Sequence, residues 1–124
     1  MLAWDADSGR ALTPVVTWQD KRSLQVLERL EASGRAEEIR ALSGLPLDPY
    51  FSAGKLAWLL ENDRAVARAS ERGSLRLGTV DSFICDRLGA GFATDPSTAS
   101  RTQLGAPEWN TALLEIFEIG RAHV

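Results

Sequence analysis

The stretch from Leu45 to Asn62 constrains this chain most, because it is a stiff loop that leads directly into a helix. Pro46 and Pro49 fix their own φ angles and push the residues before them toward extended geometry. Ser52 is a favourable N-cap residue, and leucines spaced three and four residues apart follow it. We therefore expect a helix from Ser52 to Asn62, preceded by a rigid elbow.

Tyr50 and Phe51 lie on this elbow, immediately before the expected helix. A rigid elbow of this kind can aim an aromatic ring and a phenol at a small polar ligand. The alternative is a hydrophobic staple, in which both rings only pack onto the helix that follows. Staples are the commoner of the two, and the local pattern leaves both interpretations open.

The remaining sequence predicts a mixed α and β protein with more helix than strand. Apolar or β-branched runs predict strands at residues 2–4, 14–18 and 75–77, the first two joined as a hairpin. Spaced apolar residues, caps and glycines predict helices at residues 19–33, 36–43, 52–62, 63–73 and 109–117. A further helix is expected after Gly78, with Val80, Phe83, Ile84 and Leu88 as its apolar face. Another is expected to start at Pro96, with Asp95 as its N-cap.

Composition narrows the class of protein. A length of 124 residues allows one domain or part of one. The net charge of −3 and the scattered arginines argue against a nucleic-acid partner. No apolar run approaches the roughly 20 residues that a membrane span needs, and no secretory signal is visible. The single cysteine, Cys85, cannot form an internal disulfide, so we expect a cytoplasmic protein.

Several separated blocks of sequence point to one family. The loop and helix carry the pattern Tyr50-x-Ser52-x-x-Lys55-Leu56-x-Trp58-Leu59-x-Glu61-Asn62. Further blocks follow in a consistent order and spacing: residues 18–22, 78–82, 93–95 and 99–102. Together they resemble the N-terminal domain of the FGGY carbohydrate kinases, and residues 44–52 are most similar to the glycerol kinase branch. The resemblance covers about Leu2 to Ile119 and is more specific than a single short motif.

This resemblance implies a fold, an activity and two site residues. The fold is an α/β, helix-rich, partial ribonuclease H-like domain of the actin–hexokinase superfamily. The reaction is transfer of the γ-phosphoryl group of Mg-ATP to a terminal hydroxyl of glycerol. The alternatives are a relative acting on xylulose or another sugar, or a non-catalytic binding module. Tyr50 would bind a hydroxyl of the small polyol or sugar and Trp18 its carbon skeleton, although burial in the core is the other interpretation of Trp18.

The family pattern also implies what this chain lacks. A substrate-binding Arg-Glu pair and a phosphate loop would precede Met1, and the catalytic aspartate and a second domain would follow Val124. ATP and Mg are therefore expected in the full-length parent, with binding residues outside this chain. No residue here is assigned as catalytic or as a metal ligand, and we expect the isolated chain to be inactive.

The last residues depart from the family pattern. Residues 119–124, Ile-Gly-Arg-Ala-His-Val, match the translation of a common sequencing adapter. We therefore expect residues 1–119 to form the partial kinase domain and residues 120–124 to be a non-native tail, with residues 119–124 disordered or without supporting contacts. On this interpretation His123 has no part in metal binding or acid–base chemistry.

Overall fold

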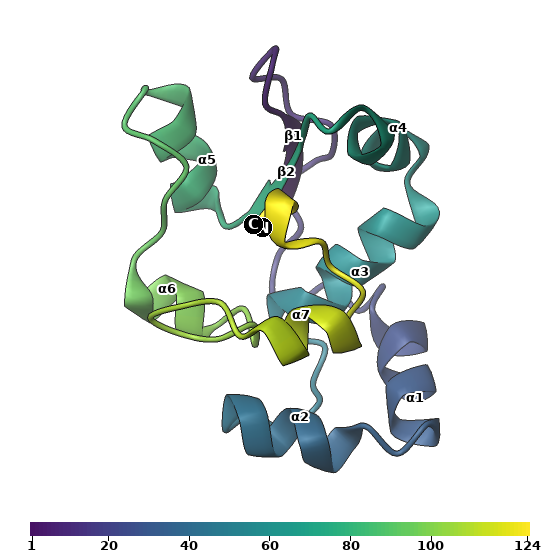
Figure 1. The fold of residues 1–124 in the computed structure, drawn as a ribbon. Helices are drawn as coiled ribbons and strands as arrows, with labels where there is room; N and C mark the ends of the chain where they lie inside the picture. Colours follow the sequence, from purple (N-terminus) through teal and green to yellow (C-terminus); the bar gives the residue numbers. More distant parts are fainter.

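The computed structural model describes residues 1–124 as a two-stranded antiparallel sheet with helices on either side (Figure 1). None of these helices is both long and apolar enough to cross a lipid bilayer. In chain order the elements are β1 (Leu2–Asp5), α1 (Leu24–Ala32), α2 (Ala36–Ser43), α3 (Ser52–Asn62), α4 (Arg64–Arg72), β2 (Leu75–Gly78), α5 (Val80–Arg87), α6 (Pro96–Ser100), α7 (Thr111–Ile116) and the 3-10 turn η1 (Arg121–His123).

The sheet joins the start of the chain to its middle. In the β1–β2 register, Ala3 lies opposite Leu77 and Trp4 lies opposite Arg76. Successive side chains of a strand point to opposite faces, so the sheet has two different faces. Ala3, Leu75 and Leu77 belong to the main hydrophobic core, and Trp4 lies on the other face. Helices α4 and α5 lie on opposite sides of this two-stranded sheet (Figure 1).

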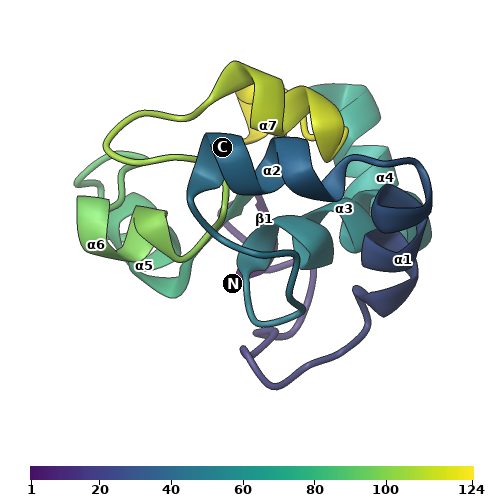
Figure 2. The ribbon, with the colours of Figure 1, turned by 90° about the horizontal axis from the view of Figure 1, so that it is seen from below.

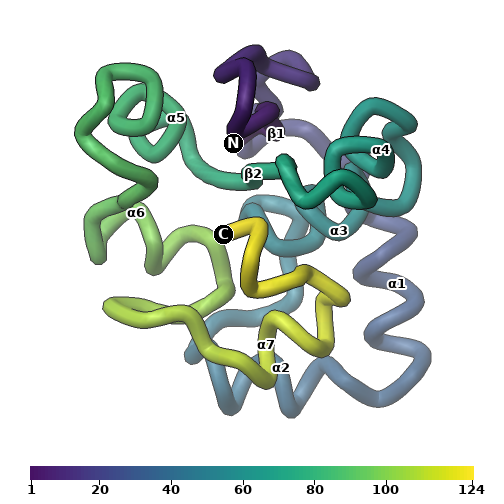
Figure 3. Tube along the Cα trace, turned by 45° about the horizontal axis from the view of Figure 1, so that its top comes forward, coloured from purple at the N-terminus to yellow at the C-terminus, as the bar shows by residue number.

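The main core is built mostly by helices. Helix α3 packs between α1 and α4, and α2 lies beside α7, although these two helices are far apart in the sequence (Figures 2 and 3). Each helix contributes an apolar stripe at helical spacing, as amphipathic helices do. The core residues from these helices are Val26, Leu27, Leu30, Ile39, Ala53, Leu56, Ala57, Leu59, Val66, Ala69, Leu113 and Leu114.

A smaller aromatic cluster covers the other face of the sheet. Trp4 is fully buried there, and its ring meets the rings of Phe83 and Phe92 edge to face, each at 5.4 Å between centroids. Its indole N–H donates to a carboxylate oxygen of Asp86 at 2.7 Å. Arg76 pairs with the same carboxylate and lies 4.9 Å from the Phe92 centroid. This cluster attaches α5 and the segment after it to β1 and β2.

The local sequence signals locate several helices correctly. The expected bounds of α2 and α3 are confirmed, and Gly44 ends α2 with a φ of 72°. The carboxylate of Asp95 caps α6 by accepting hydrogen bonds from two backbone N–H groups, as expected. Ser52 was the wrong choice of cap, because it is the first helical residue and Phe51 holds the N-cap position without a side-chain bond. The Ala53 N–H instead donates to the Thr102 carbonyl at 2.8 Å.

The predicted strand at residues 14–18 is wrong, and the helix after it starts late. Pro14 has no N–H to donate, and the Thr13 hydroxyl, not a backbone carbonyl, accepts from the Ala3 N–H at 3.1 Å. The chain before Trp18 lies beside β1, where it is held by one isolated β-bridge between Trp4 and Ala11 and by isolated backbone hydrogen bonds. Residues 18–23 form turns because the Asp20 carboxylate accepts from the Arg22 backbone and side chain, so α1 begins only at Leu24.

The predicted apolar face of α5 is largely exposed. Val80, Ile84 and Leu88 all point to solvent, and Ser82 is the buried residue of this helix. Phe83 alone joins the aromatic cluster, through Trp4. The apolar spacing therefore predicted the helix correctly but not its buried face.

The expectation that residues 119–124 lack contacts is also wrong. Ile119 is buried in the core, and its N–H donates to the Leu114 carbonyl at 2.8 Å. The η1 turn lies beside β2 (Figure 3), where the His123 ring is 3.2 Å from the Ser70 hydroxyl. The division at residue 119 and the non-native origin of residues 120–124 stay predictions, which sequencing the source DNA through these codons tests.

Asp5 provides a test of acid stability at the end of β1. Its carboxylate accepts from the Ser8 backbone, the Ser74 hydroxyl and Arg72, and these bonds, led by that of the Ser8 N–H, lower its pKa to about 2. The unfolded value is about 3.9, so the ionised group stabilises the fold above that pH, and this contribution is lost as the pH falls toward 2. Replacing Asp5 with Asn removes this titration.

We expect the Asp5→Asn variant to lose less stability than the native chain between pH 5 and pH 2, as measured by urea unfolding. Asp7→Asn is the matched control, since the Asp7 side chain makes no hydrogen bond. Equal acid sensitivity in the Asp5→Asn variant and the native chain would show that Asp5 does not carry this linkage.

Candidate functional site

The elbow before α3 separates its two aromatic residues. Phe51 is 7% exposed and packs inward, whereas Tyr50 is 42% exposed. The Tyr50 N–H donates to the Asp48 carboxylate at 2.8 Å, and the Phe51 N–H donates to the Asp48 carbonyl at 3.2 Å. Asp48 therefore closes this turn through both its side chain and its backbone carbonyl. Phe51 is therefore the buried ring of the elbow, while Tyr50 presents its ring to solvent.

Trp18 lies on the surface next to Tyr50. The backbone before it is held against β1, where the Val16 N–H donates to the Met1 carbonyl at 2.8 Å. The Trp18 side chain is 63% exposed, so the interpretation of this residue as part of the core does not hold. Its ring centroid is 5.8 Å from that of Tyr50, and the planes are tilted by 50°. The two predicted site residues, 32 positions apart in the printed sequence, thus form one aromatic pair.

A groove of about 140 Å³ lies beside this pair. Its lining combines two aromatic rings, three hydroxyls, one of them the Tyr50 phenol, and two basic side chains. Ring faces suit C–H groups, and hydroxyl and guanidinium groups suit the oxygen atoms of a ligand. This combination fits a small molecule with several hydroxyl groups. The lining residues are Met1, Val16, Thr17, Trp18, Tyr50, Ser52, Lys55 and Arg101.

Lys55 forms the buried base of this groove. It is 1% exposed, and its Nζ donates to the carbonyls of Tyr50 at 3.0 Å and Phe51 at 3.3 Å, and also to that of Pro49. Burial lowers the pKa of the Lys55 ammonium, and the charges of Asp20 and Asp48 oppose that shift.

Asp20 and Arg22 form a second fixed unit near the groove. The Arg22 guanidinium binds both carboxylate oxygens of Asp20 at 2.9 Å and lies 5.0 Å from the Trp58 ring centroid. The hydrogen bond from the Arg22 side chain lowers the pKa of Asp20. Asp20 is thereby held as a paired, ionised group, and these bonds give it a structural role in the turn.

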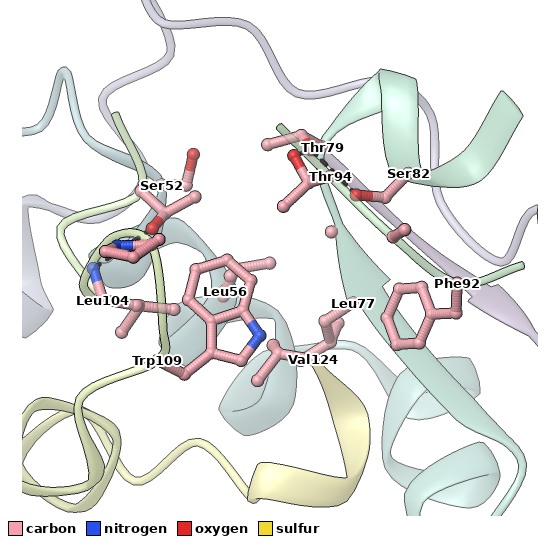
Figure 4. A pocket seen from close by; sticks show the side chains of 14 residues that line it. Ser52, Leu56, Leu77, Thr79, Ser82, Phe92, Thr94, Leu104, Trp109 and Val124 are labelled. Atoms are coloured by element: carbon pink, nitrogen blue, oxygen red, sulfur yellow. Dashed lines mark hydrogen bonds between the residues drawn. The ribbon is translucent and has the colours of Figure 1, made fainter. Parts of the chain in front are cut away.

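A larger cavity of about 230 Å³ opens on the other side of Ser52 (Figure 4). The rings of Trp109 and Phe92 stand on opposite sides of it, and the hydroxyls of Thr79, Ser82 and Thr94 lie along one edge (Figure 4). This cavity contains no charged side chain, and neither Trp18 nor Tyr50 lines it.

The structure adds two residues that sequence reasoning did not place in the site. Arg101 lines the groove, although its position in the sequence does not indicate a ligand contact. Lys55 belongs to the family pattern, but no role followed from its position in the sequence. No three His, Cys, Asp or Glu side chains converge to form a metal site. The signal for Lys55 was a basic residue in the first turn of a helix, where acidic residues are favoured.

Comparison with known proteins decides the family. The family model described as "FGGY family of carbohydrate kinases, N-terminal domain" matches residues 1–124. The chain belongs to this family. Among curated FGGY relatives, "Glycerol kinase 1" of Pseudomonas aeruginosa is 44% identical over 98% of the chain and 26% of its own length. The glycerol kinase of Thermus brockianus is also 44% identical, with the same coverage. The chain thus spans about a quarter of the length of the curated relatives it matches.

Solved structures of FGGY kinases confirm the fold. Glycerol kinase of Plasmodium falciparum with ADP superposes with a TM-score of 0.85 at 26% identity, over 94% of this chain and 24% of that protein. Ligand-bound xylulose kinase of Lactobacillus acidophilus gives a TM-score of 0.77 at 25% identity, over 98% of this chain and 24% of that protein. The predicted α/β fold of the actin–hexokinase type, present here as a helix-rich partial domain, is therefore confirmed.

The elbow itself gives a second testable prediction. Phe51→Ala should destabilise the fold by about 3–5 kcal/mol, because it empties a buried aromatic position. Tyr50→Ala should cost only about 1 kcal/mol, mainly from the lost edge-to-face contact with Phe51. Urea unfolding of the two variants measures the difference. Similar losses for both would contradict the division between a buried ring and an exposed ring.

Proposed function

We propose that this chain forms part of the N-terminal domain of a longer, ATP-dependent kinase that phosphorylates a terminal hydroxyl of glycerol. The observation that carries the proposal is the Trp18–Tyr50 groove, found in a chain 40–44% identical to many curated glycerol kinases. Its volume of about 140 Å³ is below the 300–1,000 Å³ of typical drug-sized pockets and suits a short polyol. The single cysteine and a reaction that uses ATP favour a cytoplasmic location.

In this proposal the chain binds and orients the polyol. The exposed face of Trp18 packs against the carbon skeleton, and the Tyr50 phenol forms a hydrogen bond with a substrate hydroxyl. Such a hydroxyl-specific contact discriminates between substrates, since an analogue lacking the hydroxyl leaves the phenol unpaired. Holding the polyol in one pose positions the hydroxyl that reacts.

We assign no residue of this chain to the nucleotide or its metal. No cluster of three acidic, His or Cys side chains is present, and the Gly89–Gly91 loop lacks the Lys and Ser/Thr of a P-loop. We therefore assign ATP, Mg and the general base to the rest of the longer protein. ADP accompanies the related Plasmodium falciparum enzyme in its crystal structure.

Two alternatives remain distinct from this proposal. A kinase for xylulose or another sugar is supported by the TM-score of 0.77 to a xylulose kinase, although the curated relatives favour glycerol. A non-catalytic binding module would keep the groove without the remaining kinase machinery. Sequencing the source gene on both sides of this chain separates a module from a kinase, because only a kinase needs a phosphate loop and a catalytic aspartate.

Activity measurements on the full-length gene product test the proposal. We expect ATP-dependent formation of glycerol 3-phosphate, with much lower kcat/KM for xylulose and gluconate. The 124-residue chain alone should show no turnover, because it supplies neither the nucleotide site nor the base. Preference for a sugar over glycerol would favour the first alternative. Turnover by the isolated chain would contradict the assignment of the nucleotide site to the rest of the protein.

Substitution of Tyr50 tests the groove directly. Tyr50→Phe keeps the ring but removes the phenol, so we expect kcat/KM for glycerol to fall roughly two- to twelvefold, the value of one lost hydrogen bond of about 0.5–1.5 kcal/mol. Glu37→Gln, on the exposed side of α2, is the control and should leave the kinetics unchanged. Unaltered kinetics in the Tyr50→Phe enzyme would remove Tyr50 from the site.

A further inference from the structure

Lys55 is the only charged side chain among the buried residues of this structure. None of the five ion pairs includes it, so no carboxylate lies within ion-pair distance of its ammonium. Lysine is almost never fully buried without a partner, because desolvation of the charge is costly. Its hydrogen-bond partners here are backbone carbonyls alone, so the reason for a charged side chain at this position must lie in these bonds.

The three carbonyl partners are consecutive. The Lys55 Nζ donates to Pro49, to Tyr50 at 3.0 Å and to Phe51 at 3.3 Å, so all three N–H donors of the ammonium are used. These carbonyls belong to the elbow that carries the Tyr50 ring. One side chain therefore fixes the orientation of three successive peptide groups.

Fold stability does not account for a lysine at this position. Lys55 lies in the first turn of α3, where the helix dipole favours negative and not positive charge. A buried methionine would fill a similar volume without the cost of desolvating a charge. What the ammonium provides, and an apolar side chain cannot, is simultaneous hydrogen bonding to the three carbonyls of the elbow.

We propose that Lys55 is a positioning residue for Tyr50. Its ammonium holds the carbonyls of the elbow and thereby sets the place of the phenol opposite Trp18 in the groove. Because its donors are all engaged, Lys55 acts on a polyol through Tyr50 and not by direct contact. The kinetic part of this inference rests on the proposed function.

A double-mutant cycle in the full-length enzyme tests the route of this effect. Lys55→Met should raise the KM for glycerol roughly tenfold and change kcat by less than about twofold, the pattern of lost binding. The same substitution should have little further effect in a Tyr50→Phe background, because residues that act as one unit are not additive. The matched control is Lys21→Met, because Lys21 is the other lysine of this chain and is exposed. This substitution should change neither KM nor kcat.

A second measurement does not depend on catalysis. With 3-fluorotyrosine incorporated at position 50, the fluorine resonance should shift or broaden in Lys55→Met and stay unchanged in Lys21→Met. If the methionine variant does not fold, Lys55→Arg serves in its place. It keeps the charge, but its planar guanidinium cannot direct three donors from one atom, so it should also shift the resonance.

The outcomes separate the two proposals. A full-length native protein without activity on glycerol or sugars refutes the proposed function, while a fluorine shift specific to Lys55 still supports the positioning role. Fully multiplicative effects of Lys55→Met and Tyr50→Phe on KM, or a fluorine resonance unaffected by substitution of Lys55, would overturn the inference. A change in kcat alone would place Lys55 in the chemical step and would also overturn it.

Discussion

The pairing of β1 with β2 is the constraint on which the other parts of this structure depend. It joins residues 2–5 to residues 75–78, so the intervening chain, which contains α1 to α4, must begin and end at the same sheet. Closing so long a loop costs entropy, which burial on both faces of the sheet offsets. One face completes the helical core, and the other receives Trp4 and its aromatic neighbours.

The same sheet brings the site together. The free edge of β1 holds the segment before Trp18 through the Val16–Met1 hydrogen bond, and α3, packed in the core, carries the elbow with Tyr50. Neither aromatic residue lies on a strand or in a helix. Each is placed by backbone bonds to a buried element, the usual arrangement of binding residues on loops supported by a scaffold.

Much of the fold follows from short-range signals in the sequence. The bounds of α2 and the cap of α6 follow from Gly44 and Asp95, whose preferences depend only on neighbouring backbone groups. The prediction of a strand at residues 14–18 was wrong because Pro14 and the Thr13 hydroxyl interrupt the backbone hydrogen bonding with β1. Strand propensity gives no information about this pairing with β1. The exposure of Ile84 likewise depends on what packs nearby and not on spacing.

The site was predictable in part. The family pattern drew attention to Tyr50 and Trp18, and the structure places their rings side by side, although their role in binding stays a prediction. Whether Tyr50 or Phe51 packs inward could not be read from adjacent aromatic residues, since the direction of the elbow decides it. The bonds of Lys55 depend on three carbonyls converging in space, which no local pattern specifies.

The two walls of the groove are anchored very unequally. Tyr50 stands on an elbow whose backbone is fixed by two prolines, Asp48 and Lys55, so changes in these supporting residues disturb the folded chain. Trp18 projects from a turn with more than half of its surface free, and a replacement there removes little packing. During evolution, Trp18 should therefore tolerate substitution more readily than the elbow that carries Tyr50. Under the proposed function, changes of substrate preference in descendants of such a domain should therefore accumulate first around Trp18.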